Sequence, residues 1–166
     1  MAIKSRVIVL VLLLAIILIL FGILNKTKEH RESYLTNTPL PSVVEEKTVD
    51  LSAIKFEIVD TPALRQKGLS DKESLAPGTG MLFVFDSPSK YSFWMKDMNF
   101  PIDIIWLDEN FVVVDIKTNV SPSTYPDSFA PSAPSLYVIE LNAGVAEQHG
   151  ISIGTKVRIG GVDNSE

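Results

Sequence analysis

The stretch that decides the fold reads Gly80-Met81-Leu82-Phe83-Val84-Phe85, then Tyr91-Ser92-Phe93-Trp94-Met95-Lys96-Asp97, then Pro101-Ile102-Asp103-Ile104-Ile105-Trp106. Residues 80–106, which include these three segments, contain both tryptophans and half of the eight phenylalanines of the chain. Each apolar segment is too short for a stable helix and is bounded by turn-forming residues at 86–89 and 99–101, a pattern typical of a buried antiparallel sheet. The sequence therefore predicts a β-structured centre.

The composition excludes several classes of protein. Of the 166 residues, 46% are hydrophobic and 21% are charged, as in globular or membrane-attached chains. The chain has no cysteine, which excludes disulfide frameworks, thiolate zinc sites and cysteine nucleophiles. Its net charge is −5 and no basic stripe stands out in the sequence, so we expect no nucleic-acid partner.

The amino-terminal part predicts a membrane anchor. An unbroken apolar run of 18 residues, Val7 to Leu24, follows a short basic tail at residues 1–6. As a helix it would be about 27 Å long, close to the roughly 30 Å of a bilayer core. It is longer than the apolar region of a secretory signal and lacks a small-residue cleavage site, although a cleaved signal peptide is the alternative. We expect a single-pass signal anchor, with the globular part outside the cytoplasm.

The remainder of the chain divides into a tether and one domain. Residues 25–46 are polar and charged and predict a tether, residues 47–160 a β-rich globular domain, and residues 161–166 a tail. Residues 121–134 contain four prolines and four serines, which predicts a long loop that could cover the mouth of the domain as a lid.

Within the domain the pattern predicts a mostly β fold with a few short helices. Ile54, Phe56 and Ile58 alternate with charged residues, as in a strand with one buried face. About seven or eight short strands without a βαβ rhythm favour a compact β-barrel or sandwich, preceded by the single transmembrane helix. The expected core contains Phe56, Leu82, Val84, Ile104, Val113 and Val138.

Five motifs in order carry a resemblance to a known family. They are Gly68-Leu69, Gly80 to Phe85, Phe93-Trp94-Met95-Lys96, Pro101-Ile102-Asp103-Ile104, and Glu140-Leu141-Asn142-Ala143-Gly144 with Gly150-Ile151 and Gly154. Over Phe56 to Ile159 the chain resembles the domain of unknown function 192 family. The resemblance implies a small mostly β domain, often exported in bacteria and archaea, with no established activity.

Three positions depart from the pattern of that family: Ser70, Asp97-Met98 and Thr155. The departure at Asp97 matters most, because it puts a carboxylate where an amide is usual. Chemistry that depends on that amide is therefore in doubt for this chain.

Six polar or aromatic residues are candidates for a ligand-binding site: Trp94, Lys96, Asp97, Asp103, Glu140 and Asn142. Trp94 and Lys96 share one strand face, where an indole can serve as a platform for a sugar or peptide, or simply cover one end of the fold. Asp103 lies among isoleucines, where it could act as an acid or tie down a turn through backbone amides. Glu140 ends a strand, and Asn142 precedes a short helix that it could cap.

Metal and cofactor sites are not indicated. The only histidines are His30 and His149, which leaves no imidazole cluster and no Ser-His-Asp arrangement. Carboxylates at Asp97, Asp103 and Glu140 could select a hard ion such as calcium, but they do not form a spaced binding loop. No Gly-rich phosphate loop precedes a helix, and we predict no metal and no cofactor.

Two functions from different classes remain, and no catalytic residue is assigned. The first is an extracytoplasmic binding module for a cell-envelope glycan or peptide, with Trp94 as its platform and the other five candidates as polar contacts. The alternative is a small carboxylate-dependent hydrolase that uses Asp103 and Glu140 as a working pair. A structural scaffold without a ligand is the third reading.

Overall fold

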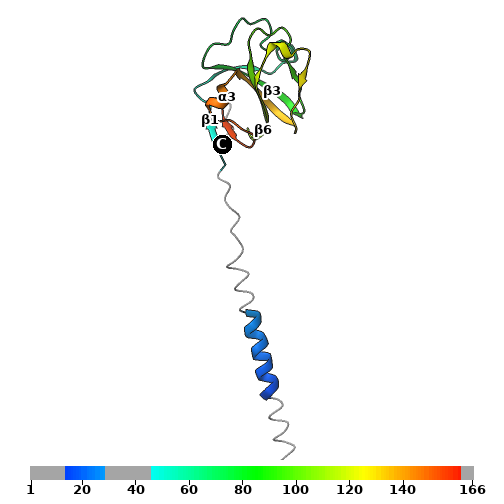
Figure 1. Ribbon diagram of the computed structural model, residues 1–166, viewed down its shortest axis with the longest axis vertical. Helices are drawn as coiled ribbons and strands as arrows, with labels where there is room; N and C mark the ends of the chain where they lie inside the picture. Colours follow the sequence, from blue (N-terminus) through cyan, green and yellow to red (C-terminus); the bar gives the residue numbers. More distant parts are fainter. Residues whose placement is uncertain (1–13, 29–45, 162–166) are drawn as a thin grey trace, which may run out of the picture. The chain divides into compact units, whose positions relative to one another are not determined.

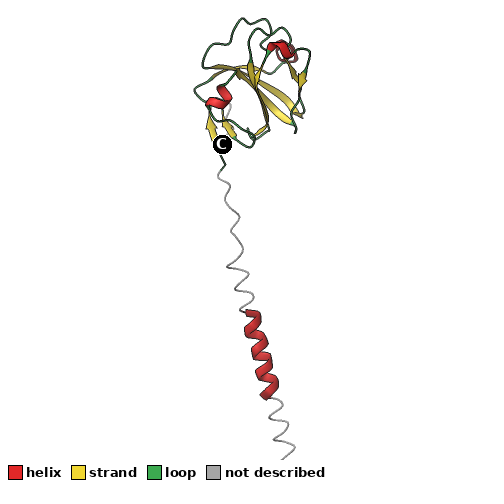
Figure 2. Cartoon of the chain, in the orientation of Figure 1, coloured by secondary structure: helices red, strands yellow, loops and turns green. Residues whose placement is uncertain are grey.

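The computed structural model describes residues 14–28 and 46–161 in two separate parts, a helix and a β-rich domain (Figures 1 and 2). Among these residues no helix is long and apolar enough to cross a membrane. This finding overturns the expected transmembrane helix at Val7 to Leu24, of which residues 7–13 lie outside the described residues.

A five-stranded mixed sheet forms the centre of the domain, in the order β2-β3-β8-β5-β6. Its strands are β2 (Lys55–Val59), β3 (Thr79–Ser89), β8 (Ser135–Asn142), β5 (Ile102–Leu107) and β6 (Val113–Val120). Strands β2 and β3 are parallel and all other neighbours are antiparallel. The crossover between β2 and β3 contains α2 (Pro62–Lys67), so the domain has one βαβ connection that the sequence pattern did not predict.

Two small ribbons accompany this sheet. β1 (Thr48–Asp50) pairs in parallel with β9 (Lys156–Arg158), and β4 (Phe93–Trp94) pairs antiparallel with β7 (Ser128–Phe129). The remaining elements are η1 (Pro122–Thr124) and α3 (Val145–Gln148). Residues 121–134 are therefore more ordered than the predicted loop, because they contain both η1 and β7.

The expected barrel is wrong, although the domain is mostly β with a few short helices. In the described part of the chain, β2 and β6 stand at opposite edges of the sheet and do not pair with each other, so the sheet does not close. The other two sheets have only two strands each and do not make the second layer of a sandwich. The physical reason is that the helical crossover sets β2 parallel to β3 at one edge, where no further strand follows.

The two faces of the central sheet carry separate hydrophobic cores. Along β5 successive side chains alternate between them, with Ile105 and Leu107 in one core and Ile104 and Trp106 in the other. All six residues of β5 are buried, because this strand has a neighbour on each side and a core on each face.

The expected core residues divide by their place in the sheet. Leu82, Ile104, Val113 and Val138 are at most 1% exposed. Phe56 and Val84 are only partly buried against the same core as Leu82. Ile58, expected to share the buried face of its strand, is 44% exposed, because β2 is an edge strand with little packed over it.

Candidate functional site

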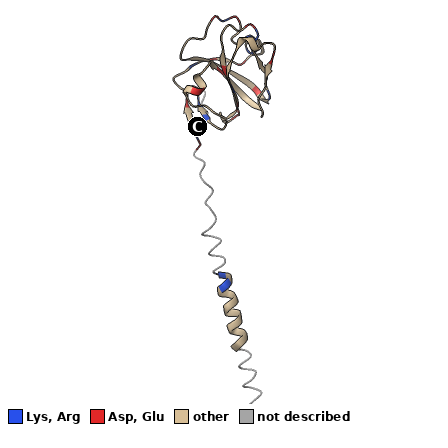
Figure 3. Cartoon of the chain, viewed as in Figure 1, with Lys and Arg blue, Asp and Glu red and all other residues tan. Residues whose placement is uncertain are grey.

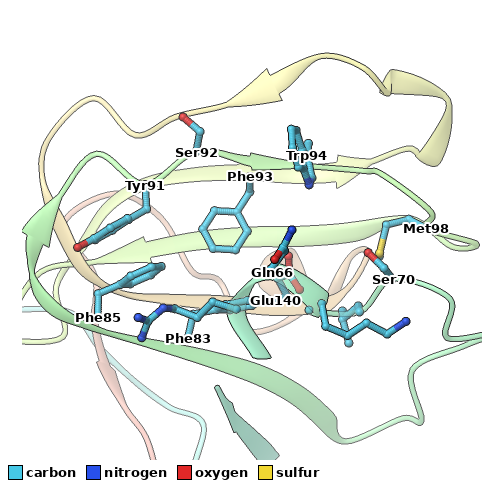
Figure 4. A pocket seen from close by; sticks show the side chains of 14 residues that line it. Gln66, Ser70, Phe83, Phe85, Tyr91, Ser92, Phe93, Trp94, Met98 and Glu140 are labelled. Carbon is cyan, nitrogen blue, oxygen red and sulfur yellow. The ribbon is translucent and has the colours of Figure 1, made fainter. Parts of the chain in front are cut away.

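A cavity of about 230 Å³ lies between α2 with its following turn, the β3–β8 part of the sheet, and the β4 segment (Figure 4). Phe93 points from β4 into this cavity, with Phe85 and Tyr91 toward one end and Ser70 and Met98 toward the other. The fourteen lining residues are Arg65, Gln66, Lys67, Gly68, Leu69, Ser70, Phe83, Phe85, Tyr91, Ser92, Phe93, Trp94, Met98 and Glu140.

Strand register places Glu140 on the cavity face of the sheet. Glu140 pairs with Met81 of β3 on one side and with Ile104 of β5 on the other. Directly paired residues share a face, and residues two positions apart along a strand share it too. Phe83 and Phe85 therefore lie on the same face of the sheet as Glu140. The neighbours of Glu140 on this face are apolar side chains.

The carboxyl group of Glu140 is buried, and one of its two oxygens has no partner in the described part of the chain. The residue is 5% exposed, and its Oε2 atom has no hydrogen-bond partner among the described residues. Burial raises the pKa of Glu140 from its ordinary value of 4.5 to about 8, so the group is mostly neutral at pH 7. An acid in this state can donate a hydrogen bond, and it can ionise when a cation approaches.

Aromatic side chains form the wall above this carboxyl group. The rings of Phe83 and Phe93 meet edge to face with centroids 4.8 Å apart, and Phe93 meets Trp106 in the same way at 6.0 Å. Phe85 and Tyr91 stack with an interplanar angle of 9°. Trp94 is 55% exposed, so part of its ring is open to a ligand.

The two cations that line the cavity are engaged elsewhere. Arg65 donates through Nη1 to the carbonyl oxygens of Asp60 and Val84, at 2.6 and 2.7 Å, and its guanidinium lies 5.1 Å from the centroid of the Phe85 ring. Lys67 forms an ion pair with Asp71. Burial is the only cause behind the raised pKa of Glu140, so neither cation compensates its charge.

A second hollow of about 270 Å³ adjoins the first. The two share Gln66, Lys67, Ser70 and Trp94 in their linings, and the second adds Ala63, Asp71, Lys96 and Asp97. The predicted residues Trp94, Lys96 and Asp97 are thus brought together, and Trp94 connects them to Glu140. Asp97 has φ 57°, a left-handed conformation in which Asp and Asn are tolerated, and this is a backbone reason for a short polar residue at this position.

Asp103 lies on the opposite face of the sheet from Glu140. It pairs with Leu141, whereas its neighbour Ile104 pairs with Glu140, so the two carboxylates project to different sides. Asp103 is fully buried, and its oxygens accept hydrogen bonds from the backbone amides of Asn119 and Ala146 at 2.8 and 2.9 Å. The structure therefore does not bring together the pair required by the hydrolase hypothesis.

Asn142 is also occupied by a structural contact. Its side-chain amide donates to the carbonyl oxygen of Leu75 at 2.9 Å. The N-cap of α3 is Gly144, without a side-chain cap, so the expected capping role of Asn142 is wrong. Asp103 takes over part of that role, because Ala146 lies in the first turn of α3.

Sequence reasoning missed the side of the cavity that α2 supplies. Arg65, Gln66 and Lys67 attracted no interpretation, although the Gly68-Leu69 motif that follows them was one of the five that carry the family resemblance. In the part of the chain that the structure describes, no group of three or more acidic or histidine side chains is placed to hold a metal ion.

Comparisons with known proteins extend these observations. The model of a family named DUF192 and described as Uncharacterized ACR matches residues 43–159. A protein of unknown function from Novosphingobium aromaticivorans DSM 12444 is 32% identical, with a TM-score of 0.59 over 62% of this chain and 73% of its own. A candidate transcription regulator from Sinorhizobium meliloti 1021 is 31% identical, with a TM-score of 0.57 over 60% and 76%. No curated protein matches the chain.

Proposed function

For this chain, which belongs to the DUF192 family, we propose that the β-rich domain is a binding module. The module takes one group of a cell-envelope glycan or peptide in the cavity around Glu140. The envelope is the proposed source of the ligand because the family resemblance implies export. Trp94 serves as the platform at the entrance, and Lys96 and Asp97 contact the ligand in the adjoining hollow.

The observation that carries this proposal is the unpartnered Oε2 atom of Glu140 in an aromatic cavity. Leaving a buried polar group unsatisfied costs about 1–3 kcal/mol. A domain that needed only a packed core at this position could replace Glu140 by an apolar residue, since its strand neighbours on this face are Met81 and Ile104. A carboxyl group with a perturbed pKa in a cavity is typical of a functional site.

The geometry gives less support to the other activities. Both oxygens of Asp103 are taken by backbone amides on the far face of the sheet, which disfavours a two-carboxylate hydrolase. The similar protein from Sinorhizobium meliloti is described as a candidate transcription regulator, but this chain has a net charge of −5, and the described acidic and basic residues are interspersed in the view of Figure 3. We therefore propose no DNA-binding role.

The test replaces Trp94 by alanine. We expect the variant to lose about 10-fold or more in retention on isolated cell-envelope material, because the exposed ring provides the platform. Folding should persist, since Trp94 is 55% exposed. The matched control is Tyr125→Ala, which removes an aromatic ring that is 48% exposed but does not line either hollow. Equal retention of wild type and Trp94→Ala would contradict the proposal.

A further inference from the structure

The cavity combines one unpartnered carboxyl group with aromatic walls, and this combination indicates a chemical class of ligand. We infer that the group bound is a primary ammonium on an aliphatic stem, as in a lysine-type side chain of a peptide, and that the ammonium pairs with Glu140. This inference rests on the proposed function, because it names the group that the binding module recognises.

The first support is the missing counter-charge. Glu140 is 5% exposed and its Oε2 atom lacks a hydrogen-bond partner within the described domain. The charged or titratable groups that line the cavity with it are Arg65 and Lys67 from α2 and Tyr91 from the β3–β4 connection. All three are engaged, since Arg65 donates to two carbonyl oxygens, Lys67 pairs with Asp71, and the Tyr91 hydroxyl donates to the Ser87 carbonyl oxygen. No cation of the lining therefore pairs with Glu140 in this structure, and a cationic ligand would supply the missing charge.

The second support is the aromatic wall. A cation is attracted to the negative face of an aromatic ring, most strongly when both are removed from water. One such contact already exists in the lining, where the Arg65 guanidinium lies over the Phe85 ring. The rings of Phe83 and Phe93 and the sulfur of Met98 offer apolar contact to the methylene groups of the stem. A free anion is less suited to this cavity, because it would meet the carboxyl group and the ring faces, and the lining cations Arg65 and Lys67 already have partners.

The third support is size. The cavity of about 230 Å³ is smaller than the roughly 300–1,000 Å³ of typical small-molecule sites, which suits a side chain better than a whole ligand. The adjoining hollow, connected through Gln66, Ser70 and Trp94, can receive the main chain that carries this side chain.

Pairing with an ammonium makes binding depend on pH in a defined direction. In the free protein the pKa of Glu140 is about 8, and an ammonium beside it lowers that pKa, so binding at neutral pH releases a proton to solvent. The fraction of ionised Glu140 in the free protein rises with pH, so the affinity should increase by about 50-fold between pH 6 and pH 8. A neutral group that accepts a hydrogen bond from the protonated acid would show the opposite trend.

The experiment measures binding of three probes to the full chain by calorimetry. The first probe is Nα-acetyl-lysine N-methylamide, the second is the norleucine analogue that lacks the amine, and the third is N-acetylglucosamine. We expect the lysine probe to bind at least about 10-fold more tightly than the norleucine probe. The affinity for the lysine probe should also increase from pH 6 to pH 8. Glu140→Gln should remove this preference, whereas Glu147→Gln, an exposed glutamate outside both hollows, should preserve it.

The outcomes separate the two claims. Equal binding of the lysine and norleucine probes to wild type, or an unchanged preference in a folded Glu140→Gln variant, overturns the inference. Binding of N-acetylglucosamine alone overturns it as well, but leaves the proposed function standing if envelope retention still depends on Trp94. If no probe binds and envelope retention is also absent, both claims fail. If the Glu140→Gln variant does not fold, the binding of the three probes to the wild type still tests the inference, because equal binding of the lysine and norleucine probes overturns it.

Discussion

Glu140 links the cavity to the stability of the domain. Its pKa is about 8 in the folded state and about 4.5 in an unfolded chain, so between these values the unfolded state binds fewer protons than the folded state. The free energy of unfolding must then fall as the pH rises. The contribution of Glu140 is fully present below pH 4.5 and is lost progressively up to pH 8.

We therefore predict that the stability of the Glu140→Gln variant, relative to that of the wild type, increases as the pH rises. The free energy of unfolding of the wild type should fall relative to that of the variant by up to about 5 kcal/mol between pH 4 and pH 8, because only the wild type has to ionise a buried carboxyl group. Urea denaturation at a series of pH values measures this difference, and titrations common to both proteins cancel. Parallel stability curves for the two proteins would mean that Glu140 is hydrated or paired in solution.

Asp103 should behave as a structural residue. Asp103→Asn keeps the shape but replaces one accepting oxygen by a donor, which leaves the amide of Asn119 or Ala146 unsatisfied. We expect a loss of about 3 kcal/mol in the free energy of unfolding, measured by urea denaturation. The control is Asp97→Asn, an exposed position with a left-handed backbone, where the change should be within about 0.5 kcal/mol. Similar values for the two variants would contradict the structural role.

The sequence could predict part of the candidate site at this scale. Alternation along one strand placed Trp94 and Lys96 on the same side, and the apolar neighbours of Asp103 suggested burial or a tied turn. The relation between Asp103 and Glu140 could not be predicted, because it depends on the register between β5 and β8, and a shift of one residue would reverse it.

At the scale of elements, the parallel pairing of β2 and β3 brings two backbones together around Gly80. A Cβ atom at this position would lie 2.7 Å from Leu141 Cδ2, 2.8 Å from Phe56 Cε1 and 3.1 Å from the Glu140 carbonyl oxygen. The missing side chain therefore lets β2, β3 and β8 pack closely on the face of the sheet opposite the cavity, where Phe56 and Leu141 lie.

We predict that Gly80→Ala destabilises the domain by about 1–3 kcal/mol, because the backbone oxygen cannot move aside without disturbing the β3–β8 pairing. Thermal unfolding measures the effect. Ser74→Ala, an exposed change in the connection before β3, is the control and should leave the midpoint within a few degrees. A neutral Gly80→Ala would show that the edge strand is loosely packed.

The elements themselves were predictable where short-range chemistry determines them. Thr61 is the N-cap of α2, Pro62 its first residue and Gly68 its C-cap, and the Thr61 hydroxyl accepts a hydrogen bond from the Leu64 amide. Strand direction was not predictable, because an apolar run has the same pattern in a parallel and an antiparallel pair. Strand β4 lies in the segment Tyr91 to Asp97, where a strand was expected, but its partner β7 was missed because it has only two residues within the predicted loop.

For the whole molecule, the sequence predicted mostly β structure but the wrong architecture. The apolar segments Gly80 to Phe85 and Ile102 to Trp106 lie in β3 and β5, the two interior strands on either side of β8, as their composition indicated. A barrel was inferred from the number of short strands, yet the number of strands does not reveal which edges remain unpaired. The closing contact between β2 and β6 that a barrel needs is absent from the described domain.

The pairing of β1 with β9 places the two ends of the domain side by side. Thr48 lies opposite Lys156 in the parallel pair, so residues 47 and 160 are five register positions apart, a gap of about 17 Å at the extended rise per residue. We predict that a linker of a few residues can join residues 47 and 160, and that new termini between Glu73 and Ser74 give a circular permutant that folds to the same structure. Amide NMR spectra of permutant and parent should superimpose away from the new ends. A permutant that fails to fold would show that the position of β1 at the start of the chain matters for folding. A permutant that folds would show that the domain can be inserted into a surface loop of another protein and retain its cavity there.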